Sequence, residues 1–463
     1  MARRVPPTMG RRNRLALAAL LSVVGLAAPA AAHGAGLSTA GDRSLSVPTW
    51  LFLSTGGGVV GASFLLASFV TDRSFIRRIH AWRRGGAVPL KRGLRALGGA
   101  VGVAGLAFVL AVGVLGPRDP TRNAAVLTVW VGWWSGFTMS TYLVGNAWPV
   151  LNPWRTLAGM LPSLDAAYPE RFDAWPSVAG VLALVWLEVV SPVADRPRFL
   201  AAVVAGYTVL TLAGAAAFGT DVWFGRVDPV SRVFRYFGRI APLYYDDGLR
   251  LRLPGAGLDE PKLITSRAEV AFVVAVLWAT TYDGLVATPL WRRFAVAAVE
   301  ADLPPRLLYP AALVVGYLAV LGVYAAAVRR SKRRAETYLP ADALARRFAP
   351  SLLAIAAGYH LAHFLGYFLE LVPSLLSAGL APLSPPAPVA LVLPSWFGGV
   401  ELAAVVLGHL LAIWVAHAAA YEVFPGKLQA VRSQYAVTAA MVCYTMASLW
   451  IVSQPYAVPP YLS

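Results

Sequence analysis

Long apolar stretches recur ten times along this chain of 463 residues, and they limit its fold more than any other feature. About 20 apolar residues cross roughly 30 Å of hydrocarbon as an α-helix. Because hydrocarbon satisfies no backbone N–H or C=O group, only helices and closed barrels span a bilayer. We therefore expect an all-α transmembrane bundle of about ten helices. The stretches are Pro48–Val70, Ala96–Gly116, Ala125–Ala147, Ser177–Ala194, Phe199–Gly219, Glu269–Trp291, Leu307–Val328, Phe348–Leu371, Gly398–Phe424 and Ser433–Ser453.

The composition supports a membrane protein. Hydrophobic residues make up 58% of the chain and charged residues only 14%, whereas a soluble domain carries about 25% charged residues. The chain has one cysteine, Cys443, which excludes an intramolecular disulfide and a cysteine-held zinc or iron–sulfur centre.

The first 32 residues have the pattern of a secretory signal peptide. Arg3 and Arg4 begin a basic segment, Leu15–Ala28 is apolar, and Ala30, Ala31 and Ala32 supply the small residues that signal peptidase needs. Cleavage after Ala32 leaves residues 33–463 as a single transmembrane domain with His33 at its amino terminus.

The distribution of Lys and Arg predicts the orientation. The loops 71–95, 148–176, 220–268, 329–347 and 425–432 hold 27 of the 40 basic residues. Basic loops stay in the cytoplasm, so both ends of the mature chain are expected outside the cell membrane. The net charge of +17 is then explained by attraction to anionic lipid. We expect the lipid bilayer as a partner and no nucleic acid, because no continuous basic face with stacking aromatic residues is visible.

Four histidines and an aspartate lie inside the predicted spans, where ionisable residues are costly and usually functional. His360 and His363 are three residues apart and so share one helix face. Counted from the outer ends of their spans, these two histidines, His409 and Asp283 lie at similar depths. His417 lies two turns further toward the cytoplasm.

Imidazoles and a carboxylate at one depth suit a divalent transition metal such as copper or zinc. The alternative is that each histidine is a hydrogen-bonding residue between helices. His417 stands apart, as a proton-path residue or a packing partner. His33 offers an amine and an imidazole, a chelate that copper favours.

Two further features are assigned to the cytoplasmic surface. Val227–Ile240 is expected to form an amphipathic surface helix, because arginines alternate there with aromatic and apolar residues. His80, among cytoplasmic arginines, is expected to be solvated.

Several short motifs together resemble the bacterial membrane proteins described as fenitrothion hydrolase-like. They are Ala32-His33-Gly34, Pro48-Thr49-Trp50-Leu51-Phe52, Asn152-Pro153-Trp154-Arg155, Tyr282-Asp283-Gly284-Leu285, Pro289-Leu290-Trp291, Ala362-His363-Phe364, Gly408-His409, Ala416-His417 and Ser433-Gln434-Tyr435. The resemblance implies a polytopic fold and hydrolysis of an organophosphorus triester, with Asp283, His363, His409 and His417 as the positions carried over.

Two classes of function compete for these residues. In a metal-dependent hydrolase, a metal-bound water attacks a phosphoryl or acyl centre, with Asp283 as ligand or general base and Tyr282 as a donor. In a transporter or metal permease, the same side chains carry protons or bind an ion in transit, and broken helices would favour this class. A haem-binding electron-transfer protein, with His363 and His409 as axial ligands, is third. The partner is a small-molecule substrate or an ion.

The predicted orientation is tested by reporter fusions at residues 340 and 463. A cytoplasm-specific reporter is expected to be active at 340 and inactive at 463. Activity at residue 463 would contradict the count of ten spans.

Overall fold

The computed structural model describes residues 49–462 apart from 87–91, 165 and 247, and most of this part is helical, with very little strand. The all-α prediction is therefore confirmed. Seven of the described helices are long and apolar enough to cross a membrane. They are α4 (Arg92–Leu115), α10 (Pro197–Phe218), α13 (Arg267–Val286), α15 (Pro305–Arg334), α16 (Ala341–Leu380), α17 (Phe397–Val423) and α18 (Lys427–Val452). The predicted signal peptide and His33 lie outside the described residues.

The other three predicted spans are interrupted or short. Helix α2 (Thr49–Ser68) is followed by α3 (Arg73–Ala81) at an angle of 115°. If this bent pair is counted as one span, the described residues contain eight candidate spans. The third predicted span is continuously helical from α5 (Ala124–Leu127) through the π-helix η1 (Thr128–Phe137) to α6 (Thr138–Leu143), so a π-segment interrupts its α-helical hydrogen bonding. The fourth, α9 (Trp175–Val190), has only 16 residues. Ten crossings therefore stay a prediction.

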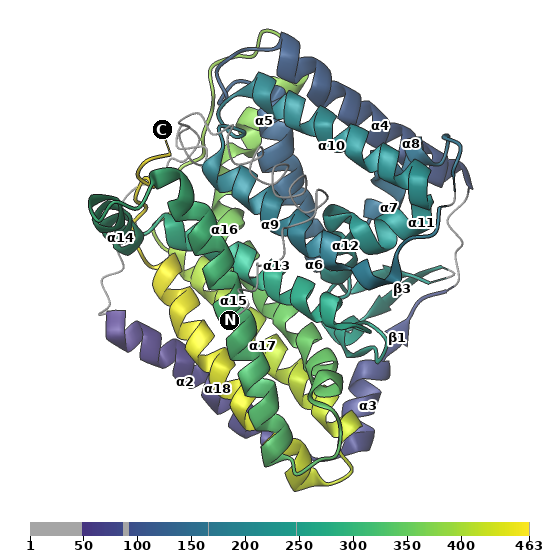
Figure 1. The fold of residues 1–463 in the computed structure, drawn as a ribbon, viewed down its shortest axis with the longest axis vertical. Coiled ribbons are helices and arrows are strands. Elements are labelled where there is room, and N and C mark those ends of the chain that lie inside the picture. The colour runs from purple at the N-terminus through teal and green to yellow at the C-terminus, as the bar shows by residue number, and fades with distance from the viewer. Residues whose placement is uncertain (1–48, 87–91, 165, 247, 463) are drawn as a thin grey trace, which may run out of the picture.

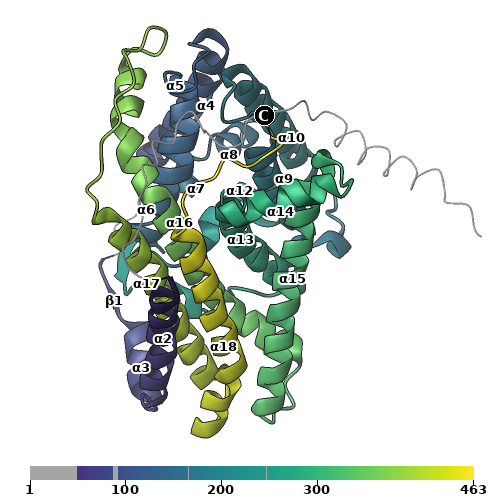
Figure 2. The ribbon, with the colours of Figure 1, turned by 90° about the vertical axis from the view of Figure 1, so that its left-hand side faces the viewer.

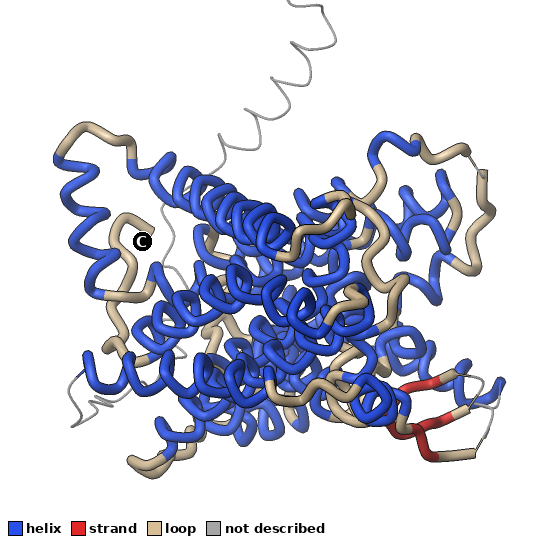
Figure 3. Tube along the Cα trace, turned by 90° about the horizontal axis from the view of Figure 1, so that it is seen from below, coloured by secondary structure: helices blue, strands red, loops and turns tan. Residues whose placement is uncertain are grey.

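Short elements connect the long helices. A small antiparallel sheet in the order β1-β3-β2 lies at one edge of the molecule (Figure 3) and pairs Arg84 with Leu251 and Tyr244 with Arg250. Its strands are β1 (Arg83–Arg84), β2 (Leu243–Tyr245) and β3 (Leu249–Arg252). The short helices are α7 (Trp148–Leu151), α8 (Pro153–Ala158), η2 (Glu170–Phe172), α11 (Thr220–Val222), η3 (Trp223–Val227), α12 (Pro229–Phe237), η4 (Ala256–Asp259) and α14 (Pro289–Glu300).

Helix α13 lies at the centre of the bundle, and most of its side chains are buried. It packs against α9, α15 and α16, while α18 lies between α2 and α15 (Figures 1 and 2). Helices α4, α8 and α10 pack together in a second region (Figure 1). The four intramembrane histidines all lie on α16 and α17.

Helices α16 and α17 approach closely at two glycines. A Cβ at Gly358 would lie 2.7 Å from the carbonyl oxygen of Ala404, and a Cβ at Gly408 would lie 2.7 Å from that of Ala354. Small residues let backbones approach in membrane helix pairs. These two glycines therefore set the spacing of the helices that carry the histidines.

The segment predicted as an amphipathic surface helix is instead buried. Helix α12 places Arg232 inside the protein, where its exposed fraction is 2%. The guanidinium donates to Glu269 Oε1 at 2.9 Å and to the carbonyl oxygen of Gly225 at 2.7 Å. The surface prediction was wrong because a basic residue with a carboxylate and carbonyl partners is stable inside a protein, and sequence does not show those partners.

Substituting Gly358 by valine tests the α16–α17 contact. The added methyl groups would meet backbone atoms of α17, so we expect a loss of about 1–3 kcal/mol in the free energy of unfolding. The measurement is denaturant unfolding in detergent micelles. The control is Gly322→Val in α15, where a Cβ has nothing within 4 Å. Equal effects of both substitutions would contradict the close contact.

Candidate functional site

Asp283 and His363 form a direct pair across two helices. Oδ2 of Asp283, near the end of α13, lies 2.9 Å from Nε2 of His363 in α16. The Asp283 side chain is 7% exposed and that of His363 is 31% exposed. The structure therefore brings together two of the predicted site residues, which lie 80 positions apart in the sequence.

Tyr359 lies beside this pair. It precedes His363 by one helical turn, and their rings are stacked at 6.4 Å with an angle of 16°. A Cβ at position 284 would collide with the Tyr359 hydroxyl, so Gly284 makes room for that hydroxyl next to Asp283. The hydroxyl is buried and has no hydrogen-bond partner among the described residues. The Tyr359 hydroxyl is thus a buried polar group that lies against Gly284, next to Asp283.

His360 contacts a different part of the protein. Its Nδ1 lies 3.0 Å from the hydroxyl of Tyr142, and its ring packs edge-on against Trp134 of the π-helix and Phe237. Its Nε2 is buried without a partner among the described residues. Three residues along a helix turn the side chain by about 60°, so residues on one general face can still contact different neighbours. His360 therefore lies in an aromatic cluster rather than on Asp283.

His409 lies near the contact between α13 and α18. Its Nδ1 is 2.9 Å from the carbonyl oxygen of Val405 in its own helix, and its ring lies 6.4 Å from that of Tyr444. The Tyr444 hydroxyl contacts the hydroxyl of Thr281, two residues before Asp283. The Nε2 atom of His409 is buried without a partner within the described part of the chain.

His417 joins three helices by hydrogen bonds. Its Nδ1 lies 3.2 Å from Oε1 of Gln434 in α18, and its Nε2 lies 3.0 Å from the carbonyl oxygen of Val70, just after α2. The amide nitrogen of Gln434 donates to the carbonyl oxygen of Ala430, which fixes the amide orientation. His417 thus faces two acceptors, and a neutral imidazole donates to one of them, according to its tautomer.

His80 is buried rather than solvated, which corrects the prediction. It lies 3.5 Å from Oδ2 of Asp259 and stacks on Trp414, which also stacks on His417. Arg347 pairs with Asp259 at 2.8 Å and also with Glu422. The i, i+4 spacing of Ile76 and His80, the two buried residues of α3, was a signal that both face the protein.

Tyr282, predicted as a catalytic donor, is directed elsewhere. Its hydroxyl donates to the carbonyl oxygen of Tyr309 in α15 at 2.9 Å, and the side chain is completely buried. A residue next to Asp283 in the sequence lies on another face of the helix. Tyr359, which is not among the predicted catalytic residues, is the tyrosine beside the pair.

A shared metal centre is not assembled in the described part of the chain. No three His, Cys, Asp or Glu side chains there lie close enough to hold one metal ion. His363 is paired with Asp283, His360 faces Tyr142, and His409 faces its own helix. The described residues thus do not fit a three-ligand zinc or copper site, and metal or haem binding stays a prediction.

Comparisons with known proteins give no relative. No known family, curated protein or solved structure matches this chain. The resemblance to fenitrothion hydrolase-like proteins therefore stays a prediction.

The Asp283–His363 pair is tested by a double-mutant cycle. Asp283→Asn and His363→Gln each remove one partner of the contact, so the loss in the double variant should be smaller than the sum of the single losses. Residues in direct contact show coupling energies of about 0.5–3 kcal/mol. The measurement is denaturant unfolding of the four proteins in one detergent.

The control cycle combines Asp283→Asn with His417→Gln, which has other partners. Distant residues are additive within about 0.3–0.5 kcal/mol. A coupling for Asp283 and His363 no larger than the control would contradict the pair.

Proposed function

We propose that this chain is a multi-pass membrane transporter that binds and releases protons at the Asp283–His363 pair and couples them to the movement of a small solute or ion. The observation that carries the proposal is the 2.9 Å contact between these two side chains, within a bundle of apolar helices. Aspartate and histidine chains inside membranes form proton relays in pumps and transporters.

The pair has two protonation states that suit this role. A carboxylate facing an imidazolium forms an ion pair, whereas the same pair with one proton fewer carries a single negative charge. The free energy of that charge depends on access to water. Helix movement that opens or closes the site to water would therefore change its proton affinity.

A line of protonatable groups continues from the pair toward the predicted cytoplasmic side. Tyr359 lies beside His363, and the Tyr444–Thr281 contact adjoins His409. His417 follows on α17, roughly 12 Å further along the helix, and Trp414 stacks on both His417 and His80. Because no continuous chain of hydrogen bonds joins these groups in the described structure, water between them would have to carry the proton.

Broken helices favour transport over hydrolysis. The α2–α3 pair bends by 115°, and the third predicted span contains a π-helix of 10 residues. Prolines lie inside the continuous helices α15, at Pro310, and α16, at Pro350 and Pro373, where each removes a backbone hydrogen bond. Interrupted helices are characteristic of secondary transporters, where they line the binding site, and π-segments are frequent at functional sites.

A hydrolase is the second candidate, and one observation favours it. The Asp283 carboxylate contacts one nitrogen of His363, Nε2, and the histidine side chain is 31% exposed. A carboxylate that orients an imidazole in this way is the arrangement of a general base. In such an enzyme His363 would take a proton from water as the water attacks an ester.

Proton binding is tested by pH steps applied to proteoliposomes on a solid-supported membrane. A pH step should produce a transient current in the wild type, because protons enter a site inside the membrane. Asp283→Asn should reduce the displaced charge at least ten-fold.

The control is Glu300→Gln, which removes an exposed carboxylate from α14 and should leave the current unchanged. A wild type without a current, or an Asp283→Asn variant with the wild-type current, would overturn the proposal. Hydrolysis of organophosphorus triesters by the wild type, lost in His363→Gln, would support the second candidate instead.

A further inference from the structure

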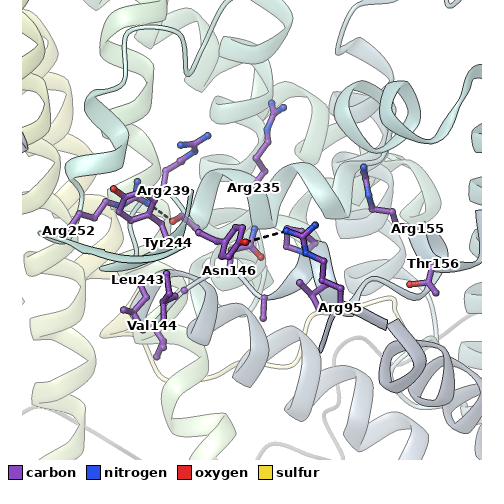
Figure 4. A pocket seen from close by; sticks show the side chains of 17 residues that line it. Arg95, Val144, Asn146, Arg155, Thr156, Arg235, Arg239, Leu243, Tyr244 and Arg252 are labelled. Carbon is purple, nitrogen blue, oxygen red and sulfur yellow. Dashed lines mark hydrogen bonds between the residues drawn. The ribbon is translucent and has the colours of Figure 1, made fainter. Parts of the chain in front are cut away.

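A large cavity lies between α4, the α6–α8 segment, α12 and the small sheet, away from the Asp283–His363 pair. Its volume is about 860 Å³, within the range of small-molecule sites. Five arginines reach it from separate elements (Figure 4), and no described residue that lines it is acidic. The five are Arg95, Arg155, Arg235, Arg239 and Arg252. We call the space that they line the arginine cavity.

Positive charge exceeds negative charge around the arginine cavity. The carboxylates that pair with its arginines in the described structure are Asp221, Glu260 and Glu269. Glu269 is also bound by Arg232, so three carboxylates pair with five guanidinium groups, and Arg95 has no carboxylate partner among the described residues. The remaining charge is available to an anion.

Arg252 is a fixed, buried cation in this cavity. Its side chain is 1% exposed, and it donates to the carbonyl oxygens of Ala241 at 3.0 Å and Gly238 at 2.8 Å. The Tyr244 ring lies 4.6 Å from its guanidinium carbon. Burial, followed by the neighbouring Arg239, lowers the pKa of Arg252 to about 10, so the side chain is still charged at neutral pH.

The fold also makes space for this arginine. A Cβ at Gly257 would collide with the Arg252 guanidinium. Backbone carbonyls and an aromatic ring already hold the Arg252 side chain in place. It therefore loses less rotamer entropy on binding an anion than a mobile surface arginine would lose.

The mouth of the cavity carries arginines that can exchange partners. Arg95 is exposed and contacts the Tyr245 hydroxyl at 3.4 Å, and it has no carboxylate partner among the described residues. Arg155 pairs with Asp221, which is 90% exposed. Exposed ion pairs of this kind contribute little to stability, so both guanidinium groups can turn to a ligand.

We propose that the arginine cavity binds a phosphate-bearing anion. Guanidinium groups match phosphate oxygens with paired hydrogen bonds. The cavity is larger than a phosphate ion, and Val144, Val150 and Leu243 supply apolar surface beside the arginines. The ligand is thus a phosphate ester, either the headgroup of an anionic phospholipid, whose acyl chains meet the apolar surface, or a soluble phosphate monoester.

The location supports this chemistry. All five arginines come from the basic segments that the charge distribution assigns to the cytoplasmic side. Basic pockets between membrane helices on that side bind lipid headgroups. The proposal does not depend on proton transfer at Asp283.

Binding is tested with delipidated wild-type protein and the double variant Arg95→Gln/Arg155→Gln. One arm measures the shift in melting temperature with inorganic phosphate and glycerol 3-phosphate in detergent. The other compares nanodiscs of phosphatidylcholine with nanodiscs that also contain phosphatidylglycerol. A response to glycerol 3-phosphate identifies a soluble ligand, and a response only to phosphatidylglycerol identifies the lipid.

The double variant should bind the responding compound at least ten-fold more weakly. The matched control, Arg292→Gln/Arg293→Gln, removes two exposed arginines of α14 and should bind like the wild type. Melting curves recorded without ligand show whether each double variant is folded. No response in either arm, or equal weakening in both double variants, would overturn the proposal.

Discussion

The close contact of α16 and α17 at Gly358 and Gly408 determines where the polar groups inside this protein lie. Each helix carries two of the four intramembrane histidines. With no Cβ at either glycine, the backbones approach until carbonyl oxygens of one helix face the α-carbons of the other. A larger side chain at either position would separate the helices and move His363 relative to α13.

Helix α13 then supplies the partners. Its position between α9, α15 and α16 brings Asp283 to His363, Thr281 to Tyr444, and Tyr282 to the backbone of α15. Three nearby residues of one helix thus have three different environments, because successive side chains point about 100° apart. Only one of them, Asp283, faces a histidine.

The charged groups divide into two regions with different chemistry. Inside the bundle the ionisable groups are few, and Asp283 and His363 lie in direct contact. At the predicted cytoplasmic side, arginines outnumber carboxylates, and several are buried on backbone carbonyls, as Arg232 and Arg252 are. The first region suits protons, and the second suits anions. Both depend on the same property, which is that a poorly hydrated charge binds its partner more strongly than a hydrated one.

Much of the fold follows from the sequence. Apolar length and backbone hydrogen bonding require helices in a bilayer, and the described chain is helical over most of each long apolar stretch. The pairing of Asp283 with His363 was also predictable in kind, since both lie at similar depth. The same reasoning placed His360 and His409 with them, but depth along a helix says nothing about which direction a side chain faces.

The sequence by itself determined the helical class, the segments at membrane depth and the short set of ionisable residues within them, because each depends on local composition. Tertiary structure decided which of those residues meet. It paired His363 with Asp283, directed His360 to Tyr142 and buried Arg232 and His80. Helix rotation and crossing depend on packing between distant segments, and contacts such as Gly358 with Gly408 are encoded by pairs of residues rather than by either one alone.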